Sequence, residues 1–296
     1  MDETLDLRPL ASRLPLDRPF TPGTARAAGL ERPALDRLHR AGLVRRVLRG
    51  VYAATGAPDT VVFRAAAVSL VVRRDTIVVD RTAAWIHGVD VRGSSPTDAL
   101  VPLDRVSRSR RDSAGTRQLT GRDVVLVEGV HVTTPLRTAL DLGRLLPAGR
   151  ALGAMDALLG IGSFTHTQLL AELPRMAGCP GVGQLRLLAP QVDARAAGPA
   201  ESVLRLHWNE ARLPTPVPGM TVAAGGRLVR LALGVDRRQF GAVLLGRVSA
   251  DDLVALEGAG WRVVVLPGER VLSSDPVSWT KHLEREFHQQ LLAQTG

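Results

Sequence analysis

Arginines gather between residues 20 and 55, where they could bind the phosphates and base edges of a nucleic acid. Seven arginines fall in this stretch, and only Glu31 and Asp36 oppose them. The planar guanidinium group donates several hydrogen bonds at once, which suits it to phosphate and to guanine. We therefore predict DNA contacts from most of these arginines and one histidine: Arg32, Arg37, His39, Arg40, Arg45, Arg46 and Arg49.

Two short helices are expected to position the first of these side chains. Thr21 suits a helix N-cap and precedes a proline, which predicts a helix over residues 22–28. A second helix is expected over residues 33–41, ended by a glycine. Arg37 and Arg40 lie three positions apart in that helix and therefore share one face.

A two-stranded ribbon is expected next, with strands over residues 43–48 and 51–53 around a turn at Arg49-Gly50. We expect its arginines on one side, in a position to contact phosphate. Two helices and a ribbon predict a winged helix-turn-helix, whose second helix enters the major groove of DNA. The same stretch also fits a small helical cap with solvated arginines. The coincidence of a glycine turn, paired arginines and a glycine-containing ribbon favours DNA binding.

A second arginine-rich segment occupies residues 104–122, between two predicted strands. The segment is polar and contains glycine, so we expect a loop. Either this loop is simply solvated, or it is a second arm that contacts phosphate. The arginines of that possible second contact are Arg105, Arg108, Arg110, Arg111 and Arg117.

Composition sets outer bounds on the function. The chain has 296 residues, a formal net charge of +9 and 45% hydrophobic residues. These values predict two or three domains and an attraction to polyanions, although a GC-rich coding bias also favours arginine. A single cysteine, Cys179, excludes an intramolecular disulfide and a cysteine zinc site. We expect no signal peptide, no membrane span, no cofactor and a soluble cytoplasmic protein.

The middle of the chain predicts a mixed α/β domain. Lone histidines such as His87 and His131 stand in apolar settings without a second histidine or carboxylate at metal-ligand spacing, so we expect structural roles and no metal site. Alanine-rich and helical-period segments predict helices, and short β-branched runs predict strands. Helices are expected at 61–72, 81–87, 135–145, 148–159 and 182–188, and strands at 75–80, 99–103, 124–127 and 130–133.

Three strings together resemble the AbiEi-type antitoxins, the transcriptional regulators of type IV toxin–antitoxin operons in actinobacteria. They are LHRAGLVRRVLRGVYA at 38–53, RTAAWIHGVD at 81–90 and GVHVTTPLRTALDL at 129–142. The resemblance implies an N-terminal winged helix that represses by occupying double-stranded operator DNA. It also implies that a partner toxin, where one exists, need not touch the antitoxin.

The C-terminal part resembles the very-short-patch-repair-type endonuclease domain, a branch of the PD-(D/E)XK fold. The strings are AESVLR at 200–205, RLPTPVP at 212–218 and LEGAGWRVVVL at 256–266. The resemblance implies three metal-binding acids, on the first helix and on the second and third strands. Glu201 stands at the helix position, but Ala232 or Leu233 and Leu244 stand at the other two. We therefore expect a pseudo-nuclease without catalytic residues, with Glu201 catalytic only if the chain is a nuclease.

The sequence thus predicts an α+β multidomain protein. Its parts are a lead-in (1–19), a winged helix-turn-helix (20–55), an AbiEi-like middle domain (56–194) and a restriction-endonuclease-like α/β domain (195–296). The predicted function is transcriptional repression, without enzyme activity. The alternatives are a metal-dependent DNA endonuclease and a non-enzymatic protein-interaction module. The sequence leaves the operator, any effector and the oligomeric state open.

Overall fold

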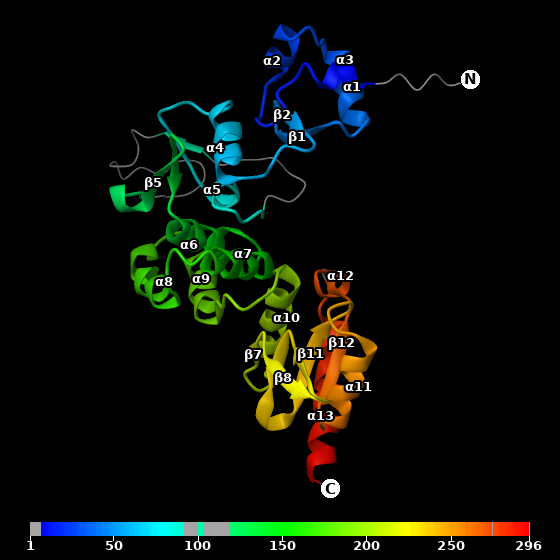
Figure 1. Ribbon diagram of the computed structural model, residues 1–296. Coiled ribbons are helices and arrows are strands. Elements are labelled where there is room, and N and C mark those ends of the chain that lie inside the picture. Colours follow the sequence, from blue (N-terminus) through cyan, green and yellow to red (C-terminus); the bar gives the residue numbers. More distant parts are fainter. Residues whose placement is uncertain (1–6, 92–99, 103–118, 274, 296) are drawn as a thin grey trace, which may run out of the picture. The chain divides into compact units, whose positions relative to one another are not determined.

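The fold was analysed in a computed structural model that describes residues 7–91, 100–102, 119–273 and 275–295 (Figure 1). The chain divides into two compact units, Met1–Thr138 and Ala139–Gly296. Each unit is mixed α/β with small sheets, which confirms the expected α+β class at that level. In the described part of the chain, no helix is long and apolar enough to cross a membrane.

The first unit begins with three short helices and a hairpin and continues into a small sheet with its own helices. Its elements are α1 (Arg8–Ala11), α2 (Pro22–Ala27), α3 (Arg32–Arg40), β1 (Val44–Leu48), β2 (Val51–Ala54), α4 (Val61–Ser69), β3 (Thr76–Val78), α5 (Asp80–Ile86), β4 (Leu100–Pro102), β5 (Val124–Val127), β6 (Val130–Thr133) and the start of α6 (Pro135–Leu145).

Capping and a narrow apolar face explain helices α2 and α3. The Thr21 hydroxyl accepts a hydrogen bond from the Thr24 N–H at 3.2 Å, which satisfies one free donor of the first turn. Gly29 then ends α2 with φ +79°, a conformation that favours glycine. In α3, Leu35 and Leu38 are fully buried. Both predicted helices are confirmed, each within one residue of its expected ends.

Strands β1 and β2 form the expected antiparallel hairpin. Arg45 lies opposite Ala53 and Arg46 opposite Tyr52, with an irregularity between Arg46 and Leu48. The turn contains Gly50 at φ +77°. Phe20 adds a third strand position, because it exchanges two backbone hydrogen bonds of 2.8 Å with Tyr52.

The hairpin is shared between two hydrophobic cores. One contains Val44 and Tyr52 together with the helices α2 and α3 and with Leu14 from upstream of Phe20. The other contains Phe63 and Trp85 of the middle segment and four hairpin residues: Val47, Leu48, Val51 and Ala53. The hairpin is therefore not a free projection, since its second face is buried against the elements that follow it.

The middle sheet has the order β4-β3-β6-β5. Strand β3 pairs antiparallel with β4 and parallel with β6, and β5 pairs antiparallel with β6. Each of these strands falls where the sequence predicts one. Helix α4 is shorter than expected, because it ends at Ser69 rather than at residue 72.

The second unit contains a helical part followed by an α/β part. Its elements are the remainder of α6, α7 (Ala148–Gly160), α8 (His166–Glu172), α9 (Val182–Leu188), α10 (Pro199–Glu210), β7 (Val217–Pro218), β8 (Thr221–Ala224), β9 (Arg227–Arg230), β10 (Leu233–Val235), β11 (Phe240–Leu244), α11 (Ala250–Gly258), β12 (Arg262–Leu266), α12 (Gly268–Val271) and α13 (Val277–Thr295).

A four-stranded sheet with the order β12-β11-β10-β7 organises the α/β part. Only β11 and β12 are parallel, with α11 as their connection. One face packs on α10 and α13 through residues such as Trp208, Phe240 and Phe287. The other face packs on α11 and the hairpin β8–β9 through Val243 and Leu256. Alternating residues of β11 thus serve two separate cores.

The segment over residues 227–233 is not one continuous strand. The structure divides it into β9, which pairs with β8, and β10, which joins the larger sheet. Leu231 donates its N–H to the Met220 carbonyl at 2.7 Å, and Ala232 donates to Ala242 at 3.0 Å. The chain therefore changes partners between these two adjacent residues.

Candidate nucleic-acid interface

The exposed face of α3 presents two arginines without acidic partners. Arg37 and Arg40 are solvent-exposed and form no ion pair with any residue in the described ranges. They lie away from Leu35 and Leu38, which anchor the helix to its core. Both guanidinium groups are therefore available to a polyanion.

Arg32 is less available than Arg37 and Arg40. It pairs with Asp36 at 3.3 Å, one helical turn away, and both side chains are largely exposed. Such a pair contributes little stability, so a phosphate could displace the carboxylate.

His39 is held by the fold although it is exposed. Its Nδ1 donates a hydrogen bond to the Val44 carbonyl at 2.9 Å, and its ring lies edge-on to Tyr52 with centroids 6.3 Å apart. This leaves Nε2 as the ring nitrogen for a ligand. The residue thus connects α3 to the hairpin as well as standing among the predicted contacts.

The hairpin arginines do not share one side, so that expectation is wrong. Arg45 and Arg46 are consecutive strand residues, and successive strand side chains point to opposite faces. The Arg45 guanidinium lies 5.0 Å above the Phe63 ring and donates to the Ala57 carbonyl at 3.3 Å. Arg46 is exposed on the other face, and Arg49 is exposed in the turn. Arg45 is therefore engaged within the fold.

Two further arginines of this region escaped the sequence reasoning. Arg13 and Arg18 are exposed and lie upstream of Phe20, in the segment interpreted as a lead-in. Leu14 is buried in the same core as α2 and α3, and Leu7 and Leu10 pack against it. The three- and four-residue spacing of these leucines was the available signal for an amphipathic turn.

The possible second arm lies outside the described residues. This applies to Arg105, Arg108, Arg110, Arg111 and Arg117, so their role as phosphate contacts stays a prediction.

Glu201, the one acid matching the nuclease pattern, is buried in an ion pair. Its side chain is 3% exposed, and Arg230 of β9 donates one hydrogen bond of 2.8 Å to each carboxylate oxygen. The Ala197 N–H adds a third at 2.9 Å. Burial by itself raises the pKa of Glu201, but the hydrogen bonds from Arg230 and Ala197 outweigh it and lower that pKa.

The residues at the other positions of the nuclease pattern do not fit a divalent metal. Ala232, Leu233 and Leu244 are buried apolar residues, and Asp236 is exposed after the end of β10. A hard cation needs several oxygen ligands. No group of three or more histidine, cysteine, aspartate or glutamate side chains in the described ranges could hold a metal ion.

Comparisons with known proteins identify the family. Residues 7–55 match a family model described as a transcriptional regulator, AbiEi antitoxin. Residues 76–189 match a second model, the AbiEi antitoxin C-terminal domain.

Two curated relatives match a larger part of the chain. The uncharacterized proteins MT2308 and Rv2248 from two strains of Mycobacterium tuberculosis are each 31% identical over 190 residues. That alignment covers 63% of this chain and 68% of each relative. No solved structure matches. The chain therefore belongs to the AbiEi antitoxin family of transcriptional regulators.

Proposed function

We propose that this protein represses transcription by occupying operator DNA with α3 and the turn of the β1–β2 hairpin. The observation that carries the proposal is the pair of exposed arginines on α3, Arg37 and Arg40, which have no acidic partner among the described residues. Helix α1, the Phe20 bridge, α2, α3 and the hairpin follow one another in the order of a winged helix. In this arrangement α3 enters the major groove.

The mechanism is electrostatic positioning followed by base readout. Arg46 and Arg49 neutralise phosphates and release counterions, which fixes the register of the protein on the duplex. Arg37 and Arg40 reach base edges, where a bidentate guanidinium selects guanine. Occupancy of the operator then excludes the transcription machinery without any chemical step.

The decisive experiment is an electrophoretic mobility shift with the DNA upstream of the protein's own gene. We expect the double variant Arg37→Ala/Arg40→Ala to lose at least about tenfold in affinity, since each specific contact is worth about 1–3 kcal/mol. Arg237→Ala/Arg238→Ala removes two exposed arginines elsewhere and is the matched control. Equal affinity of the two double variants would contradict the assignment of α3.

We further propose that residues 195–296 are a pseudo-nuclease. Helix α10, three mainly antiparallel strands, the crossover helix α11 and the parallel strand β12 support the fold assignment. The Glu201–Arg230 pair supports the loss of the metal site, because a guanidinium occupies both oxygens of the remaining acid.

Supercoiled plasmid with Mg²⁺ or Mn²⁺ tests the pseudo-nuclease directly. We expect no cleavage. Cleavage that disappears in Glu201→Ala would instead establish the endonuclease alternative, in which metal-bound carboxylates activate water.

The family also implies a partner toxin, and we propose that any such toxin is countered through gene regulation without a direct complex. Co-purification of a toxin with the full chain from the native host would contradict this and favour the protein-interaction alternative.

A further inference from the structure

Strand β12 leaves one edge of the larger sheet open. In the parallel ladder with β11, the Arg262 N–H bonds to the Gln239 carbonyl at 2.8 Å, and the Leu266 carbonyl accepts from Leu245 at 2.9 Å. Residues 262, 264 and 266 therefore turn their backbone groups toward β11. The intervening Val263 and Val265 turn theirs toward the open edge, where no residue of the described ranges pairs with them.

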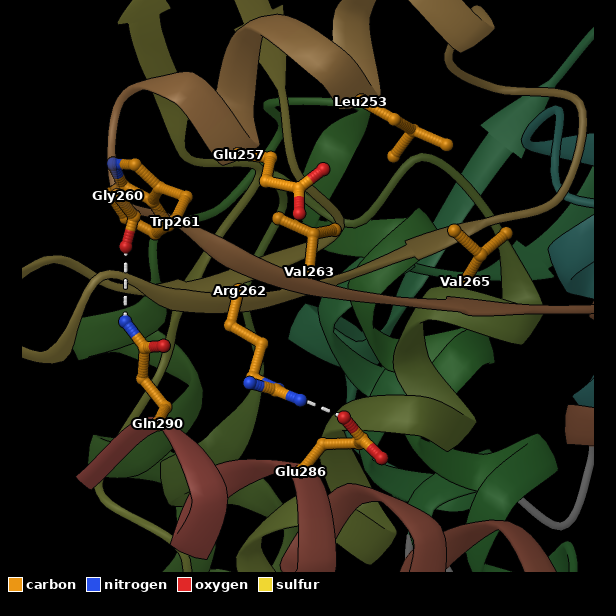
Figure 2. Close-up of a pocket in the computed structure, with 9 residues that line it drawn as sticks. All are labelled: Leu253, Glu257, Gly260, Trp261, Arg262, Val263, Val265, Glu286 and Gln290. Carbon is orange, nitrogen blue, oxygen red and sulfur yellow. Dashed lines mark hydrogen bonds and ion pairs between the residues drawn. The ribbon is translucent and has the colours of Figure 1, made fainter. Parts of the chain in front are cut away.

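A groove of about 430 Å³ follows this edge between α11 and α13. Figure 2 shows β12 along its floor, with α11 on one side and α13 on the other. The α11 side is mostly apolar, with Leu253, Val263 and Val265. The α13 side is polar, and there Arg262 points to Glu286.

We propose that this groove binds an extended peptide segment of another protein as an added strand beside β12. An exposed apolar edge is a template for strand pairing, and natural proteins usually protect such edges with lysine, proline or a covering element. Here the edge residues are valines, and the first proline, Pro267, follows the strand's end. Peptide addition at a sheet edge is an established mode of recognition, with main-chain hydrogen bonds for affinity and side-chain pockets for specificity.

The charges in the groove specify a basic peptide. Arg262 is already satisfied, because it donates to Glu286 at 2.9 Å and to Gln289 at 2.6 Å. Glu257 is exposed, and no described residue pairs with it. The uncompensated charge is thus the Glu257 carboxylate on the α11 side. It lies on the same side as Leu253 (Figure 2), so a matching segment carries an apolar and a basic residue two positions apart.

The two flanking helices favour a single strand over a second copy of this chain. A second β12 would bring its own α11 and α13 to the same edge, at the strand spacing of about 4.8 Å. A single extended peptide occupies only the width of one strand and brings no helices of its own, so it fits between α11 and α13.

Fluorescence anisotropy with the full chain and labelled synthetic peptides tests the proposal. The probe is a peptide of about six residues, the usual strand length, that alternates valine and threonine and carries one arginine two positions from a valine. We expect a Kd of about 10–100 μM. N-methylation of the peptide amides on one edge should weaken binding at least about tenfold, because it removes strand pairing without altering the protein.

A charge-reversal variant distinguishes peptide binding in this groove from nonspecific electrostatic attraction to the protein. Glu257→Lys should reverse the preference from the arginine peptide to its glutamate counterpart, whereas Glu269→Lys, an equal change at an exposed acid outside the groove, should not. Val263→Pro should also abolish binding, since proline removes an outward N–H but no ladder bond.

Three results would overturn the proposal: no peptide binding up to about 1 mM, equal binding after N-methylation on either edge, or an unchanged charge preference in Glu257→Lys. Analytical ultracentrifugation provides a fourth. If the chain self-associates and Val263→Pro abolishes this, the edge binds a second copy and not a peptide.

Discussion

At the scale of single residues, Arg45 and Arg46 are adjacent in sequence but differ in role. Arg45 lies over Phe63 and bonds the Ala57 carbonyl, whereas Arg46 is exposed. We expect Arg45→Ala to lower the free energy of unfolding by about 1 kcal/mol through the lost cation–π and packing contacts. We expect Arg46→Ala to leave stability unchanged and to reduce the salt slope of DNA binding by about 1.

Thermal unfolding and mobility shifts at several salt concentrations measure both effects. Each variant serves as the control for the other, because both remove one arginine from the same strand. A salt slope that falls in Arg45→Ala and not in Arg46→Ala would mean that the two faces of the hairpin have been assigned the wrong way round.

The Glu201–Arg230 pair makes stability depend on pH. The pKa of Glu201 lies below its ordinary value of 4.5, so its carboxylate stabilises the fold above that value. The contribution is lost as the pH falls from about 4.5 through the folded-state pKa. Glu201→Gln should therefore cost about 2 kcal/mol at pH 7, less than a fully buried pair because the Arg230 side chain is 41% exposed.

Chemical denaturation of wild type and Glu201→Gln between pH 7 and about pH 3 tests this linkage. The difference in unfolding free energy should shrink toward acid pH. A difference that stays constant would show that the variant loses packing and not the charged pair.

At the scale of elements, local signals in the sequence predicted most helices and strands. Thr21 and the proline after it marked α2, because their chemistry acts within one helical turn. Helix α8 was missed although Thr165 and Gln168 form a capping box at its start.

Other features depend on contacts between distant residues and carry no local signal. The switch between β9 and β10 occurs at Leu231 and Ala232, whose adjacent amides donate to carbonyls on opposite sides of the chain, those of Met220 and Ala242. The contact that holds Arg45 within the fold depends on Phe63, which lies in the next helix. The ion pair of Glu201 requires Arg230, which lies 29 residues further along the chain on β9. The sequence therefore indicated which side chains were candidates for function, but not which residues they contact in the fold.

The hairpin is also a joint between helices α2 and α3 and the middle sheet. Its buried second face packs on Phe63, so Phe63→Ala should cost about 3–4 kcal/mol. Hydrogen exchange should show reduced protection of the β1 and β2 amides in that variant. Phe164→Ala makes the same truncation at a buried site in the second unit and should leave those amides protected. Equal loss of protection in both variants would contradict the joint.

At the scale of the whole molecule, the chain belongs to a family of transcriptional regulators, and the proposed operator binding depends on which arginines are available. Only part of the net charge of +9 is available to bind DNA, because many arginines already form ion pairs within the fold. Arg144 and Arg205, for example, are buried with aspartates. The free arginines of α3 and the hairpin turn are therefore a better guide to function than the total charge.

The salt dependence of operator binding can decide whether the winged helix reads DNA alone. Each neutralised phosphate contributes about −0.9 to the slope of log K against log salt. The two arginines assigned to phosphates, Arg46 and Arg49, predict a slope of about −2 per bound chain, and the five of residues 105–117 would bring it to about −6. Replacing those five with alanine should leave a slope of about −2 in either case. A wild-type slope near −2 would therefore exclude the second arm, whereas a slope that falls from about −6 to about −2 in the variant would establish it.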